Sequence, residues 1–259
     1  MKLINNKMLM AVLMVISALG IIAGCTHKNE PVPVPVSTAV VITHGKHVHL
    51  AGVTAGDTSQ WKFDKVHSAV NWSSPFEGIG APITGKFNQF GIVNVTSGQM
   101  QNYTTSSQPL ADTSWAFYEN QPEKTHFAGY VQVNQVNTGE PGRDGGCLVS
   151  TLGTSAIVAG TQNLTVSNVA MIKTTSVAFD PTSNDYIVNF NFTWQGKLTA
   201  PLTEQIVGKL SYVPETFFVD HQEFGLVLKF QINCRDFGVT STSVADIITI
   251  EVHANFNNK

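Results

Sequence analysis

The sequence is poor in charge, in cysteine and in helical pattern. Charged residues make up only 13% of the 259 residues, with 15 Lys and Arg against 18 Asp and Glu, and there are 3 cysteines. No basic tract or cluster occurs, which argues against a nucleic-acid partner. Apolar residues rarely recur at a helical spacing, which argues against a helical protein.

Catalytic motifs are missing as well. The chain contains no G-x-S-x-G, H-E-x-x-H, P-loop or dinucleotide-binding fingerprint. Ser59 and Lys62 fit S-x-x-K, but the companion S-D-N and K-T-G elements are absent and the serine precedes a strand. Asp64 and His67 are separated by an i to i+3 spacing, which places them on opposite faces of a strand and argues against a dyad. We therefore expect a protein that is not an enzyme, since a hydrolase would need a clustered nucleophile and base.

What the sequence does contain is typical of a β-rich protein outside the cytoplasm. Ser, Thr, Asn, Gln, Val and Gly are plentiful, and 42% of the residues are hydrophobic. This length and this apolar fraction suit one globular domain with a sizeable core, plus appendages.

The N-terminus has the pattern of a bacterial secretory signal. Lysines near the start precede an apolar run that ends too soon for a confident membrane-spanning helix. Residues 22–25, Ile-Ala-Gly-Cys, resemble a lipobox, which implies a signal peptide at 1–24 and lipid attachment at Cys25. Several acyl chains on one residue suffice for stable anchoring. Thr26 follows, where an Asp would favour the inner membrane, so we expect an outer-membrane lipid anchor facing the periplasm of a bacterial cell envelope. The alternative is an ordinary signal peptide with a chance cysteine.

Residues 25–58 have the composition of a tether behind the lipidated cysteine. The run Pro-Val-Pro-Val-Pro-Val at 31–36 favours an extended polyproline II conformation, which would hold a domain clear of the bilayer. His44, His47 and His49 follow, and the last two would share one face of a strand. No Cys, Asp or Glu lies close by to complete a ligand set, so we expect a polar linker and no metal site.

From residue 61 onward, apolar and polar residues alternate, which predicts β-strands. Several such strands separated by Gly, Pro, Asn and Asp predict an antiparallel sandwich or barrel over residues 59–259. Residues 143–160 are small and apolar and predict a short helix or lid, whereas the polar stretch from residue 100 predicts a long loop. The clearest apolar faces are Tyr186, Val188, Phe190, Phe192 and Trp194; Leu226, Leu228, Phe230, Ile232 and Cys234; and Ile248, Ile250, Val252, Ala254 and Phe256.

Three segments together resemble the YceI-like family, the lipocalin-like, polyisoprenoid-binding proteins of the bacterial periplasm. Residues 61–91 carry an aromatic, a D-x-x-H-S element and a G-x-F-x-x-F-G stretch. Residues 131–148 carry T-G and then R-D with a following Leu, and I-N-C-R-D-F-G-V from residue 232 resembles [DN]-R-x-D-F-G. The matching residues of the first two segments are Trp61, Asp64, His67, Ser68, Gly85, Phe87, Phe90, Gly91, Thr138, Gly139, Arg143, Asp144 and Leu148.

The resemblance implies an all-β fold, an eight-stranded antiparallel lipocalin-like β-barrel around an elongated apolar cavity. The implied ligand is an isoprenoid-like or other amphiphilic lipid, and no cofactor is implied; burying an apolar chain contributes about 0.8 kcal/mol per CH₂ without any catalytic group. The alternative is a barrel filled by its own phenylalanines, a non-enzymatic interaction or structural module of the cell envelope. The candidate ligand-binding residues, in the cavity wall or at its mouth, are His67, Phe87, Phe90, Arg143, Asp144, Phe190, Phe192, Phe230 and Phe237.

Some of these residues have an alternative role. Arg143 and Asp144 either contact a polar headgroup or fix a loop by a salt bridge or a helix cap. His67 either contacts the ligand or packs at the start of a strand. The expected partners are the lipid ligand, the membrane through the N-terminal anchor and, as an open possibility, a second copy of the chain in a homodimer.

The chain departs from the family motifs at two cysteines. Cys147 falls within R-D-x-x-L, and Cys234 replaces the arginine of the last motif. In an oxidising compartment, with Cys25 consumed by lipid, these two cysteines remain for a disulfide. Such a bond would contribute roughly 4 kcal/mol in the chain-entropy model. The alternative is two buried free thiols.

Overall fold

The computed structural model describes residues 61–93, 100, 115–119, 121–155, 157–158 and 160–258. The predicted signal peptide, Cys25, the tether and its histidines lie outside these residues, as does most of the predicted long loop after residue 100. Among the residues that are described, no helix is long and apolar enough to cross a membrane.

The described part of the chain is mostly β-strand. The strands are β1 (Lys62–Pro75), β2 (Pro82–Phe87), β3 (Phe90–Ile92), β4 (Trp115–Ala116), β5 (His126–Gln132), β6 (Val136–Asn137), β7 (Val169–Asp180), β8 (Asp185–Trp194), β9 (Leu202–Phe218), β10 (His221–Asn233) and β11 (Ile247–Asn257). The helical parts are 3-10 turns at Pro122–Lys124, Val133–Gln135 and Val166–Asn168, a π-turn at Arg143–Cys147, and α2 at Leu148–Thr151.

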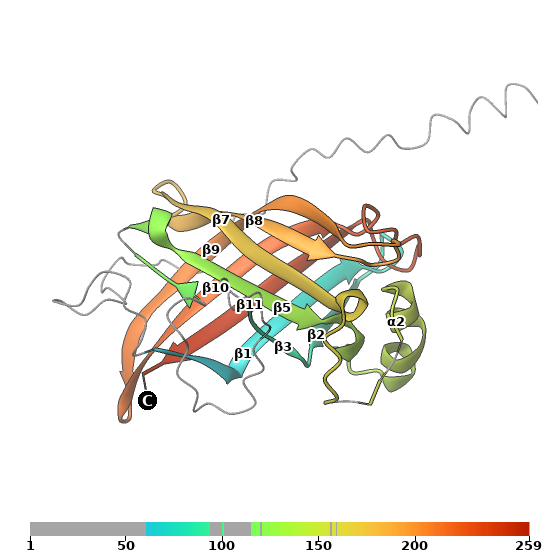
Figure 1. Ribbon diagram of the computed structural model, residues 1–259, viewed down its shortest axis with the longest axis horizontal. Coiled ribbons are helices and arrows are strands. Elements are labelled where there is room, and N and C mark those ends of the chain that lie inside the picture. Colours follow the sequence, from blue (N-terminus) through green and yellow to red (C-terminus); the bar gives the residue numbers. More distant parts are fainter. Residues whose placement is uncertain are drawn as a thin grey trace, which may run out of the picture. The chain divides into compact units, whose positions relative to one another are not determined.

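The strands form one antiparallel sheet that curls into a barrel (Figure 1). Neighbouring strands follow the order β3-β5-β7-β8-β9-β10-β11-β1-β2-β6, and β4 pairs with β5. Phe87 of β2 pairs with Val136 of β6, and Phe90 of β3 pairs with Val131 of β5. The order begins with β3, which continues β2 along the chain, and ends with β6, which continues β5. The β2–β6 and β3–β5 pairings therefore join the same two positions of the wall, and the sheet closes on itself.

The predicted all-β barrel is confirmed, although the strands are divided differently. The sequence predicted eight strands, and the described residues form an 11-stranded sheet. Two wall positions hold an interrupted strand: Asn88 and Gln89 separate β2 from β3, and the turn at Val133–Gln135 separates β5 from β6. The short β4 adds to the side of β5. The wall therefore keeps eight positions.

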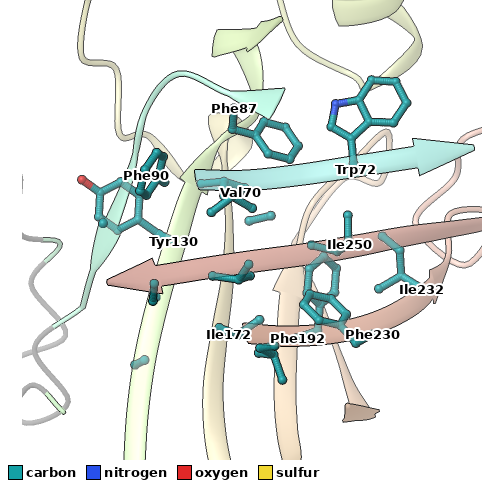
Figure 2. Close-up of a pocket in the computed structure, with 18 of the residues that line it drawn as sticks. Val70, Trp72, Phe87, Phe90, Tyr130, Ile172, Phe192, Phe230, Ile232 and Ile250 are labelled. Carbon is teal, nitrogen blue, oxygen red and sulfur yellow. The ribbon is translucent and has the colours of Figure 1, made fainter. Parts of the chain in front are cut away.

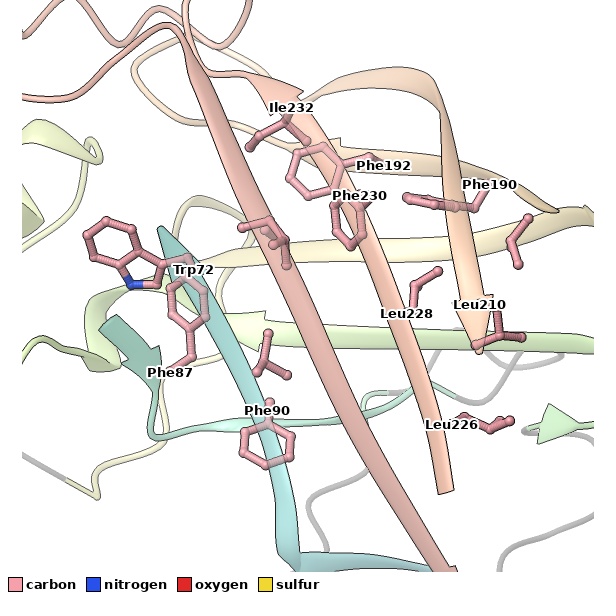
Figure 3. Close-up of a cluster of buried hydrophobic side chains, with 14 of the residues drawn as sticks. Trp72, Phe87, Phe90, Phe190, Phe192, Leu210, Leu226, Leu228, Phe230 and Ile232 are labelled. Atoms are coloured by element: carbon pink, nitrogen blue, oxygen red, sulfur yellow. The ribbon is translucent and has the colours of Figure 1, made fainter. Parts of the chain in front are cut away.

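The alternating apolar faces point into the barrel. The five apolar positions of β8 are buried, with Tyr186, Val188 and Phe190 all 0% exposed, and those at the end of β10 are buried as well. On β11, Ile250 and Phe256 are buried, while the other three are half-buried and pack against the same core. Phe190 and Phe230 pack edge to face, with ring centroids 4.9 Å apart (Figure 3).

A second, smaller apolar cluster packs beside β3, β5 and β7. Val93, Ala128, Tyr130 and Val169 form it, and they alternate along β5 and β7 with the residues that face the main core. Burial raises the pKa of Tyr130 to about 12. Ala128 and Tyr130 of this cluster also border the cavity inside the barrel.

The predicted short helix lies at residues 143–151, within the expected segment of 143–160. It consists of the π-turn at Arg143–Cys147 continued by α2, of which Leu148 and Val149 are buried. The described residues that follow α2 lead into β7 without further α-helix.

Candidate ligand-binding cavity

An apolar cavity of about 180 Å³ lies inside the barrel (Figure 2). An engineered protein cavity of about 150 Å³ lined by aliphatic and aromatic residues stays dry and binds benzene. The volume found here therefore suits a section of a slender apolar chain. Aromatic side chains form much of the wall, namely Phe63, Trp72, Phe87, Phe90, Trp115, Phe127, Tyr130, Phe192, Trp194, Phe230 and Phe256.

The wall of the cavity extends along the strands. On β11 every second residue from Ile248 to Phe256 contributes to it. Eight residue steps at about 3.3 Å each span about 26 Å. The wall is therefore long along the barrel axis, as the resemblance implied.

The wall carries almost no charge among the described residues. His253 is the one basic residue along it; its ring is 40% exposed, and Nε2 lies 2.9 Å from Glu251 Oε1. An ionised headgroup placed inside would lose its hydration without meeting a counter-charge, at a large free-energy cost. The cavity therefore suits the uncharged part of a ligand.

One end of the barrel is closed by the segment 234–246. Phe237 and Val239 are 0% and 1% exposed, and the Phe237 ring lies 5.3 Å from that of Trp194. Arg235 holds the segment, because its Nε donates to Asp246 Oδ1 at 2.7 Å. Its terminal nitrogens donate to the carbonyls of Val239 at 2.8 Å, Ser241 at 2.9 Å and Val244 at 2.7 Å.

The other end is closed by packed aromatic rings. Trp115 and Phe256 have ring centroids 4.2 Å apart, and Phe224 stacks on Phe256 at 4.7 Å. Phe117 is fully buried, with its centroid 4.9 Å from Tyr212. The short strand β4 places Trp115 within this group, and through it the segment at 115–116 contributes to the main core.

Four of the predicted ligand-binding phenylalanines lie in the cavity wall: Phe87, Phe90, Phe192 and Phe230. Phe190 and Phe237 are buried elsewhere in the core, Phe190 against Phe230 and Phe237 in the plug at the barrel end. The six phenylalanines thus pack in one core, but only part of that core borders the cavity.

Arg143 and Asp144 lie outside the cavity wall and fix a turn. The Asp144 carboxylate accepts hydrogen bonds from the Thr138 backbone N–H at 2.9 Å and from the Thr138 hydroxyl at 2.5 Å. Arg143 Nε donates to the same hydroxyl oxygen at 2.8 Å. These contacts favour the loop-fixing role over contact with a headgroup.

The prediction that Asp64 and His67 lie on opposite faces of a strand is wrong. His67 Nδ1 lies 2.7 Å from Asp64 Oδ2, and the His67 backbone N–H donates to Asp64 Oδ1 at 3.2 Å. The reason is a bulge in β1, where pairing with β11 jumps from Asp64–Asn255 to Ala69–His253. Extra residues in one strand break the alternation on which the prediction depended.

Each member of this pair changes the pKa of the other. Burial acts to raise the pKa of Asp64, but the hydrogen bonds from His67 and Asn257 outweigh it and leave that pKa below its usual value. The hydrogen bond to Asp64 and the negative charge of that carboxylate both act to raise the pKa of His67, which lies above 6.5. Ser68 Oγ donates to the Asp64 carbonyl at 2.6 Å, not to the imidazole. With the His67 side chain 71% exposed and outside the cavity wall, the pair stabilises the bulge.

The structure does not show the predicted disulfide, since the thiols of Cys147 and Cys234 are both free. Cys147 is exposed on the π-turn, whereas Cys234 is 2% exposed and lies in the cavity wall. Cys234 donates its S–H to the Ala245 carbonyl at 3.4 Å. Burial raises the pKa of the Cys234 thiol, which makes it a poorer nucleophile.

The arginine that the last motif seemed to have lost stands one position later. Arg235 follows Cys234 and makes the contacts that close the barrel end. The sequence analysis also missed two tryptophans of the wall, Trp72 and Trp115. Strand alternation around Trp72 gives a signal for that residue, whereas Trp115 stands beside a long polar stretch and gives none.

Comparison with known proteins identifies similar sequences and folds. The model of the YceI-like domain family matches residues 61–256. No curated protein sequence matches the chain.

Several solved structures are similar at low identity. Burkholderia cenocepacia BcnA is 16% identical, over 74% of this chain and 98% of that chain, with a TM-score of 0.44. A polyisoprenoid-binding domain from Saccharophagus degradans is 11% identical, over 76% and 97% of the two chains, with a TM-score of 0.41. The YCEI protein of Campylobacter jejuni is 15% identical, over 69% and 86%, with a TM-score of 0.48.

Proposed function

Because the chain belongs to the YceI-like domain family, we propose that its barrel binds the apolar chain of an amphiphilic lipid. The observation that carries this proposal is the uncharged, aromatic-rich cavity between two closed barrel ends. Burial of a chain there contributes about 0.8 kcal/mol per CH₂. An isoprenoid-like chain is the ligand class that the family resemblance implies.

Binding proceeds without catalysis in this proposal. A hydrolytic site needs a nucleophile hydrogen-bonded to its base. Near the Asp64–His67 pair, the Ser68 hydroxyl instead donates to a backbone carbonyl, and the imidazole is bound to the carboxylate. The pair also lies outside the wall of the cavity.

We also propose that Cys25 carries a lipid anchor and that the barrel faces the periplasm. The lipobox-like sequence before Cys25 supports this placement. Fractionation of cells tests it: the chain should occur in the membrane fraction, and Cys25→Ser should release it or leave an uncleaved precursor. An unmodified Cys25 in the mature chain would contradict the anchor.

Native mass spectrometry of the gently purified protein tests lipid binding. We expect a bound hydrophobic small molecule that is released on unfolding. A protein that is lipid-free as isolated and takes up neither farnesol nor decylubiquinone would contradict the proposal, and a reproducible protein partner for that lipid-free barrel would favour an interaction module instead.

A further inference from the structure

The two ends of the cavity are closed by packed side chains among the described residues. Phe237 and Val239, held by Arg235, close one end, and the aromatic group around Trp115 closes the other. Interiors packed in this way contain few voids larger than a water molecule. A ligand that reaches the cavity without displacing a plug must pass between strands.

One interruption of the barrel wall lies between β2 and β3 on one side and β5 and β6 on the other, and we call it the seam. Here β2 pairs with β6 at Lys86–Asn137 and Phe87–Val136, and the pairing resumes only at Phe90–Val131. Two backbone hydrogen bonds cross the interruption: Asn88 N–H to Gln135 O at 2.9 Å and Gln132 N–H to Gln89 O at 2.8 Å. By contrast, β10 and β11 pair without a break from Glu223–Asn257 to Asn233–Ile247.

The inner side of the seam borders the cavity directly. Phe87 and Phe90 stand on one side of the interruption (Figure 2), and Val131 and Val133 stand on the other. All four belong to the cavity wall. Next to them Gly129 approaches Gly91 so closely that an added Cβ would lie 3.3 Å from the Gly91 carbonyl oxygen. The seam therefore has fewer interlocking side chains than a continuous ladder.

On its outer side the seam is held by two buried glutamines. Gln135 Oε1 accepts the Gly160 N–H at 3.0 Å, and its Nε2 donates to Val158 O at 3.1 Å. Gln132 Oε1 accepts the Asn163 N–H at 2.9 Å, and its Nε2 donates to Thr161 O at 3.1 Å. The side chains of Gln132 and Gln135 thus hold the backbone of a loop, residues 157–158 and 160–163, which we call the latch.

These observations point to a lateral gate. We infer that a lipid chain enters and leaves the cavity through the seam. The seam opens when the latch detaches from Gln132 and Gln135 and the strands β2 and β3 part from β5 and β6. This inference rests on the proposed lipid binding, and it assigns the route. Hydrogen bonds to a loop exchange for hydrogen bonds to water when the latch opens, so the wall can open locally while the rest of the barrel stays folded.

A reversible cross-link across the seam tests the route. Lys86→Cys with Asn137→Cys joins register neighbours on β2 and β6, and the matched control, Lys229→Cys with Glu251→Cys, joins register neighbours on β10 and β11. None of these four residues belongs to the cavity wall. Cys25→Ser and Cys147→Ser in the background leave the buried Cys234 as the one native thiol of the sequence.

The measured quantity is the rate of decylubiquinone binding and release, followed by quenching of tryptophan fluorescence. We expect the oxidised seam variant to bind and release the quinone at least about tenfold more slowly, with the rates restored on reduction and little change in Kd. The oxidised control should match its reduced form. Equal rates for the oxidised and reduced seam variant would overturn the gate, even if both bind the quinone. No binding by any form would overturn the proposed function, and the gate with it.

A second variant covers the case in which the cross-link does not form. Gln135→Ala removes the bonds to Val158 and Gly160 and should speed binding and release alike. In hydrogen exchange the amides of Asn88 and Gln132 should exchange faster than those of β10, and Gln135→Ala should increase this difference. Unchanged rates and unchanged exchange in this variant would overturn the role of the latch.

Discussion

At the scale of single residues, Arg235 shows how one side chain can close a barrel end. The guanidinium presents five donors in a plane, and here it satisfies one carboxylate and three backbone carbonyls. Without it the loop carbonyls would lack donors in partly buried surroundings. Lysine has a single charged nitrogen and cannot span the same acceptors.

We predict that Arg235→Ala lowers the free energy of unfolding by about 2–4 kcal/mol, and that Arg235→Lys recovers only part of this loss. The matched control is Arg143→Ala, which loses contacts to Thr138 only and should cost less than about 1 kcal/mol. Urea denaturation measures all three. Similar losses at the two arginines would contradict the role given to Arg235.

The Asp64–His67 pair predicts a window of pH dependence. Because the folded pKa of His67 is raised above 6.5, its contribution to stability is complete below that pH and is lost as the pH rises through the folded pKa. Because the folded pKa of Asp64 is lowered from 3.8, its contribution is complete above that pH and is lost as the pH falls through the folded pKa. The pair should therefore stabilise the bulge most between pH 3.8 and 6.5.

Nuclear magnetic resonance tests this linkage directly. The imidazole of His67 should titrate with a midpoint above 6.5, and Asp64→Asn should lower that midpoint. His221, whose pKa is raised by hydrogen bonds to Asp220 and Glu223, is an internal control and should keep its midpoint. An unchanged His67 midpoint in Asp64→Asn would show that the carboxylate does not hold the imidazole in solution.

The two cysteines of the barrel should react differently with a maleimide. Cys147 is exposed and should be labelled in the native protein, whereas Cys234 is buried, has a raised pKa and should be labelled only after unfolding. Peptide mapping by mass spectrometry locates the label. A mass that rises by about two hydrogens on reduction would instead restore the disulfide that the sequence suggested.

At the scale of elements, the contact between β1 and β2 depends on one glycine. Trp72 pairs with Gly85, and a Cβ added at Gly85 would lie 2.6 Å from the Trp72 indole nitrogen. The ring is buried at 6% exposure and has little room to move. The absence of a side chain at residue 85 thus leaves the space that the Trp72 indole occupies in the cavity wall.

We predict that Gly85→Ala lowers the free energy of unfolding by about 1–3 kcal/mol, because the tryptophan must shift in a packed core. Gly145→Ala is the matched control, since nothing lies within 4 Å of the added carbon. Thermal unfolding of both variants provides the measurement. A neutral Gly85→Ala would mean that the indole has another position available.

The elements were predictable where a strand runs without interruption. The apolar faces of β8 and β10 follow from alternation alone, because β8 pairs with β9 and β10 pairs with β11 without a shift in register. The bulge after Asp64 and the break at Gln132–Gln135 were not predictable, since each depends on hydrogen bonds to residues far along the chain. The sequence does not distinguish a buried glutamine from an exposed one, because tertiary contacts decide whether the side chain is buried.

At the scale of the whole molecule, the barrel and its cavity follow from the inward faces taken together. The family motifs pointed to the cavity, and Phe87, Phe90, Phe192 and Phe230 do line it. His67, Arg143 and Asp144 were assigned to the same site because they share those motifs, yet they stabilise a bulge and a turn. Motif membership alone does not separate wall residues from residues that shape the loops.

The measurement that tests lipid binding most directly is a quinone titration of a barrel whose cavity has been filled. Ala170 is 6% exposed and lies in the cavity wall on β7, whereas Ala178 is exposed on the same strand. Decylubiquinone should quench the tryptophan fluorescence of the unmodified protein and of Ala178→Phe with the same Kd. In Ala170→Phe, with its fold checked by circular dichroism, we expect the Kd to rise at least about tenfold. A folded Ala170→Phe that binds the quinone as tightly as Ala178→Phe would contradict binding inside the barrel.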